Sequence, residues 1–385
     1  MLAGQLVEHG RFEVVETDAP VLAEGTVPAA GRVLMDTYRT SICGSDLHLV
    51  YKPGIYRGEH PAPPGWPGHE SVGTVLESQS ADFKPGDWVL AAPPPSVSRA
   101  FAQQQTVAAG SLVRLPDGSN PDHQVLAQQL GTVVFAMHRF WPLSHNGEAG
   151  SVAIFGAGTA GLFFVQLARL AGFEKIIVSD LTESRLALAA QFGATTTVLA
   201  SAQSLPAAVL DETSGAGADL VIEAVGLDST RIDCLAAVRD EGRIGYFGFP
   251  ESHHPEAPWS FSQAWSKRPS IEVSTGAQRE PGLPAFHEAV ALIASGTVDV
   301  VSLAADVYPL TSIQDAFDAA RDRQGPKISI QLPSTRLSLP YRAQPPHPPH
   351  AGSNSPAHGG RDGSGGLIAG AAGRAASVAE PGGPT

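Results

Sequence analysis

Two short segments of the chain carry side chains that bind transition metals. The first segment is Cys43-Gly44-Ser45-Asp46-Leu47-His48, and the second is Gly68-His69-Glu70. A thiolate and an imidazole nitrogen are a natural pair of ligands for Zn²⁺, at about 2.3 Å and 2.0–2.1 Å from the ion respectively. We therefore predict that Cys43 and His69 bind one metal ion together.

A glycine pattern follows the apolar segment S-V-A-I-F and reads Gly156-Ala157-Gly158-Thr159-Ala160-Gly161. In this context the pattern predicts a dinucleotide-binding turn. The first glycine allows the tight turn, the second lets the backbone approach a pyrophosphate, and the third permits close packing of helix on strand. The N-terminus of the helix that begins at Thr159 and Ala160 attracts the anion.

Asp180 ends the strand that follows the glycine pattern. Its carboxylate can accept hydrogen bonds from the ribose diol of adenosine, and it would repel a 2′-phosphate. The residue therefore favours NAD over NADP as the cofactor.

The elements that must position these residues change character along the chain. Residues 1–145 contain short strands separated by Gly and Pro, which indicates a small β-barrel or sandwich. Over 146–278, apolar strands alternate with helices, which predicts a doubly wound parallel sheet and an α/β fold class. Residues 279–333 are expected to rejoin the β domain. Residues 334–385 are rich in Pro and Gly, and we expect a disordered C-terminal tail there.

Composition excludes several classes of function. The 385 residues contain 25 Lys+Arg and 38 Asp+Glu, and a net charge of −13 disfavours a nucleic-acid partner. No apolar segment is long enough to span a membrane, and the N-terminus lacks the pattern of a signal peptide. Two cysteines exclude a disulfide framework and a four-cysteine zinc site. We expect a cytoplasmic protein with no membrane partner.

These motifs occur in a fixed order, with Lys84-Pro85-Gly86-Asp87 between the metal and the glycine motifs. The order resembles the zinc-dependent medium-chain dehydrogenase/reductase family, which includes alcohol, sorbitol, threonine and glucose dehydrogenases. The resemblance covers residues 2–332. It implies a GroES-like catalytic domain made of 1–145 and 279–333, with a Rossmann NAD-binding domain, 146–278, inserted between the two parts.

The resemblance also implies the metal ligands. Cys43 and His69 match two ligands of a catalytic zinc, and Glu70 matches an acidic neighbour that can ligate the ion transiently. The family places a third ligand four residues before a threonine near the nicotinamide. Here that threonine is Thr132, which selects Gln128; Gln129 is the alternative if the register differs by one. Some polyol and sugar dehydrogenases resemble this chain in using glutamine, a weaker zinc ligand than a carboxylate or a thiolate.

Many members of that family carry a second, structural zinc in a four-cysteine lobe. The corresponding stretch of this chain is short, A-A-P-P-P-S-V-S at 91–98, and it contains no cysteine. We therefore expect one catalytic zinc per chain and no structural zinc. Relatives use the lobe in contacts between subunits, and this chain gives no reason to expect those contacts. A homo-oligomer, either a dimer or a tetramer, is compatible with the sequence.

A path for the proton is implied by two more residues. Oxidation of an alcohol requires loss of its proton before hydride leaves. Ser45 can hydrogen-bond the alcohol, and His48 can pass the proton to solvent near neutral pH; both match relay positions of the family. The alternative for Ser45 is a helix cap. Arg185 matches a position that contacts the adenosine ribose, and a solvated helix face is its alternative.

The sequence thus predicts a zinc- and NAD-dependent dehydrogenase that oxidises a secondary alcohol, of polyol, sugar or cyclitol type, to a ketone. The Pro- and aromatic-rich segment 51–66 is expected to wall the substrate pocket. One alternative is a zinc-free reductase of activated double bonds, which the pair Cys43 and His69 disfavours. The other is a non-catalytic dinucleotide-binding protein, which the presence of ligands and relay residues disfavours.

Overall fold

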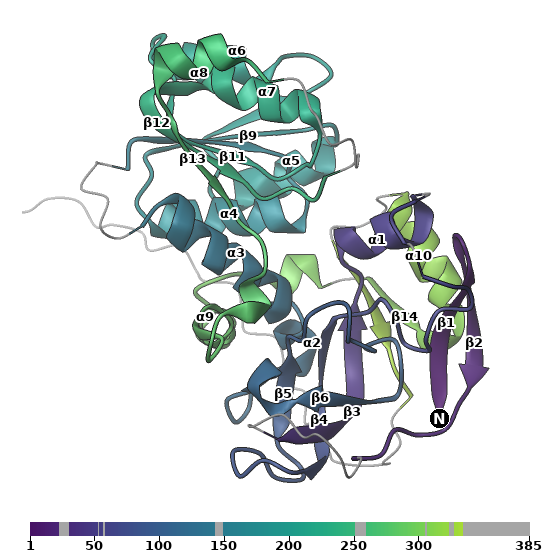
Figure 1. Ribbon diagram of the computed structural model, residues 1–385. Helices are drawn as coiled ribbons and strands as arrows, with labels where there is room; N and C mark the ends of the chain where they lie inside the picture. The colour runs from purple at the N-terminus through teal and green to yellow at the C-terminus, as the bar shows by residue number, and fades with distance from the viewer. Residues whose placement is uncertain are drawn as a thin grey trace, which may run out of the picture. The chain divides into compact units, whose positions relative to one another are not determined.

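The computed structural model describes residues 1–22, 31–52, 54–56, 58–142, 149–250, 259–304, 306–322 and 327–333. The tail expected at 334–385 lies outside the described residues. Two larger sheets and a hairpin of β1 (Leu2–Glu8) and β2 (Arg11–Glu16) organise the described part of the chain (Figure 1).

The first large sheet has seven strands and is built around β3 (Arg32–Ser41). Eight of the ten β3 residues are buried, and the strand pairs antiparallel with three neighbours. These neighbours are β4 (Glu70–Ser78), β6 (Gln104–Ala108) and β15 (Ile328–Gln331); the sheet also contains β5 (Trp88–Ala91), β7 (Leu112–Arg114) and β14 (Asp306–Pro309). The β-rich domain predicted from the start of the chain is confirmed, and strands from 306–331 complete its sheet.

The second sheet is the predicted doubly wound parallel sheet. Its order is β10-β9-β8-β11-β12-β13, and every pairing is parallel. The strands are β8 (Ser151–Phe155), β9 (Lys175–Asp180), β10 (Thr196–Leu199), β11 (Ala218–Glu223), β12 (Val238–Tyr246) and β13 (Ser270–Val273). The strand order reverses between β8 and β11, and ligands bind outside the carboxyl ends of strands at such a point.

Helices cover both faces of the parallel sheet, and the central strand β8 is apolar from Val152 to Phe155, as a strand buried on both faces requires. Along β8, Val152 and Ile154 pack in one core cluster and Ala153 and Phe155 in another. The first cluster includes α3 (Ala127–Phe140), α4 (Thr159–Leu170), α5 (Glu183–Phe192) and α9 (Pro284–Ala294). The second includes α6 (Leu205–Glu212) and α7 (Asp228–Ala237), with α8 (Phe261–Lys267) beside them (Figure 1).

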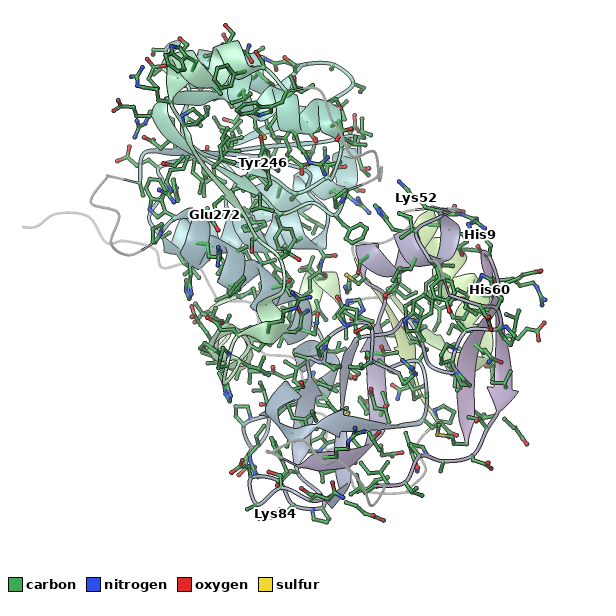
Figure 2. The ribbon with its side chains drawn as sticks, in the orientation of Figure 1. His9, Lys52, His60, Lys84, Tyr246 and Glu272 are labelled. Carbon is green, nitrogen blue, oxygen red and sulfur yellow. The ribbon has the colours of Figure 1, made fainter. Side chains whose placement is uncertain are left out.

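The remaining helices belong to the β-rich part. They are α1 (Gly44–Tyr51), α2 (Pro121–Gln124) and α10 (Ile313–Arg321). The predicted turn at Lys84–Asp87 is closed by a hydrogen bond from the Lys84 N–H to Asp87 Oδ2, 2.8 Å long, and Gly86 supplies the positive φ of +93°. Figure 2 shows Lys84 at this turn and Lys52 just after α1.

Candidate active site

Three potential metal ligands meet at the junction of β3, α1 and β4. Ser41 ends β3 and pairs with Glu70, the first residue of β4. Cys43 comes two residues after Ser41, and His69 comes directly before Glu70. Both side chains therefore start from the same end of this strand pair. Ligand atoms of Cys43, His69 and Glu70 all lie within 4.8 Å of one another. His69 and Glu70 are buried, and Cys43 is half-buried. A thiolate, an imidazole and a carboxylate at this spacing form a donor set that suits zinc.

Asp46 orients the His69 ring. Its Oδ1 lies 3.1 Å from His69 Nδ1, and its Oδ2 accepts a hydrogen bond from the Cys43 N–H at 2.9 Å. The Pro67 carbonyl oxygen lies 3.2 Å from the same ring nitrogen. Because Nδ1 faces these two oxygens, Nε2 remains as the nitrogen that can ligate a metal, an arrangement common at metal-binding histidines.

The electrostatics of this cluster favour positive charge. Burial lowers the pKa of His69, but Asp46 and Cys43 outweigh burial and raise that pKa well above its ordinary value. An environment that stabilises a proton on the ring also stabilises a cation beside it. The donor set and its charge therefore both fit a zinc ion.

Glu70 forms an ion pair with Lys327, a residue that no sequence motif identified. Lys327 Nζ lies 2.6 Å from Glu70 Oε2, and both side chains are almost fully buried. The Ser41 hydroxyl donates to the same carboxylate oxygen. Burial raises the pKa of Glu70, but Lys327 and His69 outweigh it and hold the pKa below its ordinary value. Glu70 Oε1 has no hydrogen-bond partner among the described residues, so one oxygen stays open toward a metal.

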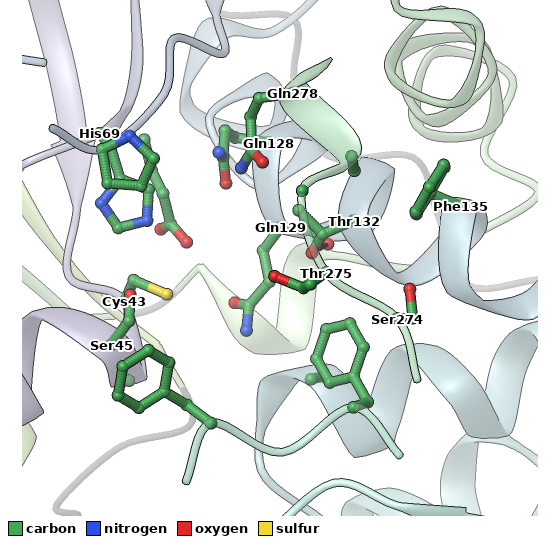
Figure 3. A pocket seen from close by; sticks show the side chains of 18 of the residues that line it. Cys43, Ser45, His69, Gln128, Gln129, Thr132, Phe135, Ser274, Thr275 and Gln278 are labelled. Atoms are coloured by element: carbon green, nitrogen blue, oxygen red, sulfur yellow. Dashed lines mark hydrogen bonds between the residues drawn. The ribbon is translucent and has the colours of Figure 1, made fainter. Parts of the chain in front are cut away.

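The two candidate glutamines differ in their partners. Both line the pocket that contains the metal cluster (Figure 3). Gln129 Oε1 accepts a hydrogen bond from Lys327 Nζ at 2.7 Å. Gln128 is 1% exposed, and its side chain makes no hydrogen bond among the described residues. Its Nε2 is a donor that cannot ligate a metal, whereas its amide oxygen can. Gln128 is therefore the glutamine whose amide oxygen is not engaged by a protein donor in the described part of the chain.

The two relay candidates line the same pocket. Ser45 and His48 lie three residues apart in α1, so their side chains share one face of the helix. The N-cap of α1 is Cys43 rather than Ser45, which removes the capping role considered for Ser45. His48 also lines a second pocket, and its ring contacts Phe249 edge-on with 5.1 Å between centroids.

This second pocket, of about 410 Å³, lies along the glycine motif. Gly156 has φ of +92°, and a Cβ on Gly161 would lie 1.8 Å from the Gly156 carbonyl oxygen, so both positions require glycine. Gly158 is the N-cap of α4. Six residues that were predicted to bind the cofactor line this second pocket: Gly156, Gly158, Thr159, Ala160, Asp180 and Arg185. Thr132, also predicted to lie at the cofactor, lines the metal pocket instead.

Asp180 closes the turn of the glycine motif. Its Oδ2 accepts a hydrogen bond from the Ala157 N–H at 2.8 Å, and its Oδ1 accepts one from the Thr182 N–H at 2.9 Å. The carboxylate thus ties the end of β9 to the loop after β8. It is partly exposed and faces the second pocket.

Glu223 at the end of β11 is a further residue that the patterns missed. It is fully buried, and its Oε1 accepts hydrogen bonds from the N–H groups of Val225 and Gly226 and from the Thr230 hydroxyl. Ala224 and Val225 line both pockets. The carboxylate therefore fixes the backbone that lies between the metal cluster and the glycine motif.

The walls of the metal pocket differ from the prediction. None of the described residues in 51–66 lines it, although Tyr51 and Lys52 line the second pocket. The rings of Tyr56 and Trp66 contact each other in a tilted arrangement with 4.3 Å between centroids, and Trp66 is buried in the core of the β domain. Pro94, Pro95 and Ser96 form that wall instead, because the shortened stretch 91–98 ends beside the site. Across the pocket, Phe135 and the segment with Ser274, Thr275 and Gln278 complete the walls (Figure 3).

Two family models match the chain, one for each of its two sheets. A family model described as "Alcohol dehydrogenase GroES-like domain" matches residues 29–130, and one described as "Zinc-binding dehydrogenase" matches residues 160–295. The L-threonine 3-dehydrogenase of Bacillus subtilis (strain 168) is 27% identical over 351 residues, which is 84% of this chain and 96% of that protein.

Solved structures share the fold. The alcohol dehydrogenase TADH from Thermus sp. ATN1 superposes with a TM-score of 0.74 and 25% identity, over 86% of this chain and 100% of that one. Galactitol-1-phosphate dehydrogenase from Escherichia coli superposes with a TM-score of 0.72 and 21% identity, over 86% and 100% of the two chains. The GroES-like domain and the Rossmann-like sheet are thereby confirmed. Among the described residues, no helix combines the length and the apolar character needed to cross a membrane.

Proposed function

Since the chain belongs to the zinc-dependent medium-chain dehydrogenase/reductase family, we propose that it is an NAD-dependent dehydrogenase of a secondary alcohol, of polyol, sugar or cyclitol type. One observation carries the proposal. The metal cluster and the glycine motif line two adjacent pockets that share residues, among them Gly44, His48, Gln129, Ala160 and Val225. An alcohol at the cluster and a nicotinamide from the second pocket can therefore meet.

Cys43, His69 and Gln128 would hold the zinc, with Glu70 as a neighbour that can ligate it. When bound, zinc supplies Lewis acidity that lowers the pKa of an alcohol. The amide oxygen of Gln128, which accepts no hydrogen bond among the described residues, and the open Oε1 of Glu70 support this ligand set. A neutral amide as third ligand is the feature that favours a polyol or sugar substrate.

The relay residues would remove the alcohol proton. Ser45 lines the pocket beside Cys43, and His48, one helical turn further, lines both pockets. In the proposed path, the Ser45 hydroxyl takes the alcohol proton while passing its own to His48, which releases it to solvent. Phe249 contacts the His48 ring edge-on, and Phe135 and Phe247 line the same pocket, so apolar rings lie beside the proposed path.

The purified full-length protein should contain one zinc per chain and reduce NAD with a secondary alcohol. Metal analysis by mass spectrometry, followed by absorbance at 340 nm with graded polyols and cyclitols, measures both. Two zinc ions per chain that resist mild chelation would contradict the single site. A protein without zinc that reduces activated double bonds would be the reductase, and cofactor binding without turnover of any substrate would indicate a non-catalytic protein.

Cofactor choice provides a second prediction. We expect kcat/KM with NAD to exceed that with NADP by at least about tenfold, because a 2′-phosphate beside the Asp180 carboxylate costs about 1.4 kcal/mol or more. Asp180→Ala should narrow the ratio by removing the repulsion. Asp117→Ala, a change in an exposed turn outside both pockets, should leave the ratio unchanged. A wild-type protein that prefers NADP would show that Asp180 does not face the ribose.

A further inference from the structure

Glu223 anchors the loop that follows β11. The residue ends that strand and is fully buried. Its Oε1 accepts hydrogen bonds from the N–H groups of Val225 and Gly226, at 2.9 and 2.7 Å, and one from the Thr230 hydroxyl at 2.8 Å. These donors belong to the loop 224–226 and to α7, so the carboxylate fixes the path by which the loop leaves the sheet.

The same residue anchors the loop that follows β12. The Glu223 carbonyl oxygen accepts hydrogen bonds from the N–H groups of Phe247 and Gly248, both 2.9 Å long. A Cβ on Gly248 would lie 2.3 Å from the Gly226 nitrogen and 2.7 Å from Glu223 Oε2. A Cβ on Gly226 would lie 2.0 Å from the Phe249 carbonyl oxygen. The carboxylate therefore lies between two loops that have no room to move closer to each other.

These two loops form the junction of the two pockets. Ala224 and Val225 line both pockets, and the loop 247–249 lines the metal pocket. From that second loop, Phe249 contacts the ring of His48 with 5.1 Å between centroids. A cofactor that lies along the glycine motif and reaches toward the metal cluster must pass this junction with its nicotinamide end.

The choice of a carboxylate at this position favours a role other than stability. Glu223 Oε2 has no hydrogen-bond partner among the described residues. A buried polar atom without a partner costs free energy, and an apolar side chain would avoid that cost. An apolar side chain could not, however, accept three hydrogen bonds at one point. The residue type therefore serves the placement of the loops better than it serves the core.

We propose that Glu223 is a positioning residue for the nicotinamide end of the cofactor, acting through the loops 224–226 and 247–249. The inference rests on the proposed function, because it requires NAD(H) to bind in the second pocket. Glu223 itself lines neither pocket, so it acts only through the loops. Loss of its acceptor should loosen the place of the nicotinamide ring and leave intact the place of the ADP part, at Asp180 and the glycine motif.

Two ligands that differ at the nicotinamide end test the proposal: NADH, and ADP-ribose, which lacks that ring. Calorimetric titration of the full-length, zinc-loaded protein gives both Kd values. We expect Glu223→Ala to weaken NADH binding about tenfold or more, because two buried N–H groups lose their acceptor. ADP-ribose binding should change by less than about twofold. The fluorescence of bound NADH, which depends on the surroundings of the reduced ring, should shift toward that of free NADH.

Conservative variants separate the acceptor from the rest of the side chain. Glu223→Gln keeps an amide oxygen at the same place and should recover most of the NADH affinity. Glu223→Asp keeps the charge but withdraws the acceptor by one methylene, so it should show the selective loss of NADH binding. Because it changes the volume little, Glu223→Asp also decides the inference if Glu223→Ala does not fold.

Asp219→Ala is the matched control, because Asp219 lies at the other end of β11 and outside both pockets. Its carboxylate also accepts three hydrogen bonds, from the N–H and hydroxyl of Ser151 and from Arg239 Nε. A loss that is only structural affects the strand in both variants. The control should therefore unfold at a lower urea concentration than wild type and keep the wild-type ratio of the two Kd values.

The outcomes separate this inference from the proposed function. Glu223→Ala or Glu223→Asp that weakens NADH and ADP-ribose equally, or weakens neither, would overturn the inference and leave the proposed function intact. The same selective loss in Asp219→Ala would also overturn it, since the effect would then belong to the strand as a whole. A wild-type protein that binds neither ligand would overturn the proposed cofactor, and the inference with it.

Discussion

Lys327→Met is expected to lower the free energy of unfolding by about 3–5 kcal/mol, because it leaves the buried carboxylate of Glu70 without its cation. Both side chains are at most 3% exposed, and Nζ lies 2.6 Å from Oε2. The change also removes the hydrogen bond that Gln129 accepts. Urea unfolding, with the midpoint and the slope m compared to wild type, measures the loss.

Adding Glu70→Gln to Lys327→Met separates the stability lost with the ion pair from the stability lost with side-chain packing. Lys327→Met combined with Glu70→Gln should recover most of the lost stability, because the buried charge then disappears together with its partner. Lys327→Arg keeps a cation and should cost less than the methionine. A loss under about 1 kcal/mol in Lys327→Met would show that Glu70 finds another partner, and a double variant no better than the single one would attribute the loss to packing.

Gln128→Leu is expected to weaken zinc binding by about 100-fold or more, since it would remove the proposed third ligand, and even the hydrogen-bond partners of ligands contribute about 10–100-fold. Leucine has a similar volume and fits a site that is 1% exposed. Gln129→Leu should keep the zinc, because the Gln129 amide oxygen is engaged with Lys327. Competition with a chromophoric chelator measures both affinities without reference to turnover.

Gln128→Glu completes the series. A carboxylate binds zinc more tightly than an amide, so this variant should retain the metal against a higher concentration of chelator. Loss of zinc from Gln129→Leu but not from Gln128→Leu would move the ligand by one residue. Retention by both would leave Glu70 or water as the third ligand and would remove the amide as a reason to expect a polyol.

Much of the fold could be predicted because its central elements have strong periodicity. The predicted strand 151–155 and the predicted helix start at Thr159 agree with the structure. Five apolar or small residues directly before a glycine turn are typical of a buried strand. The weak elements were not predicted. β13 is four residues long and largely exposed, and β10 is also four residues long; such segments carry too little apolar pattern to identify them.

The site was predictable where local motifs supply it and not where distant chain segments meet. Cys43, His69 and Asp180 stand in recognisable short patterns. Lys327 stands in none, and it reaches Glu70 only because β15 pairs with β3. The segment 51–66 was assigned to the substrate wall from composition alone, but its aromatic rings pack in the core of the β domain.

The pairing of β15 with β3 also sets the order of events during synthesis. β15 lies between β14 and β3 within the seven-stranded sheet, yet Ser41 and its partner Ser329 are far apart in the chain. At about 5–20 residues per second, Ser329 emerges roughly 15–60 s after Ser41. The parallel sheet, whose strands are contiguous from Ser151 to Val273, can fold during that interval. The nascent chain must therefore carry Cys43, His69 and an unpaired Glu70 on an incomplete sheet until its last strand arrives.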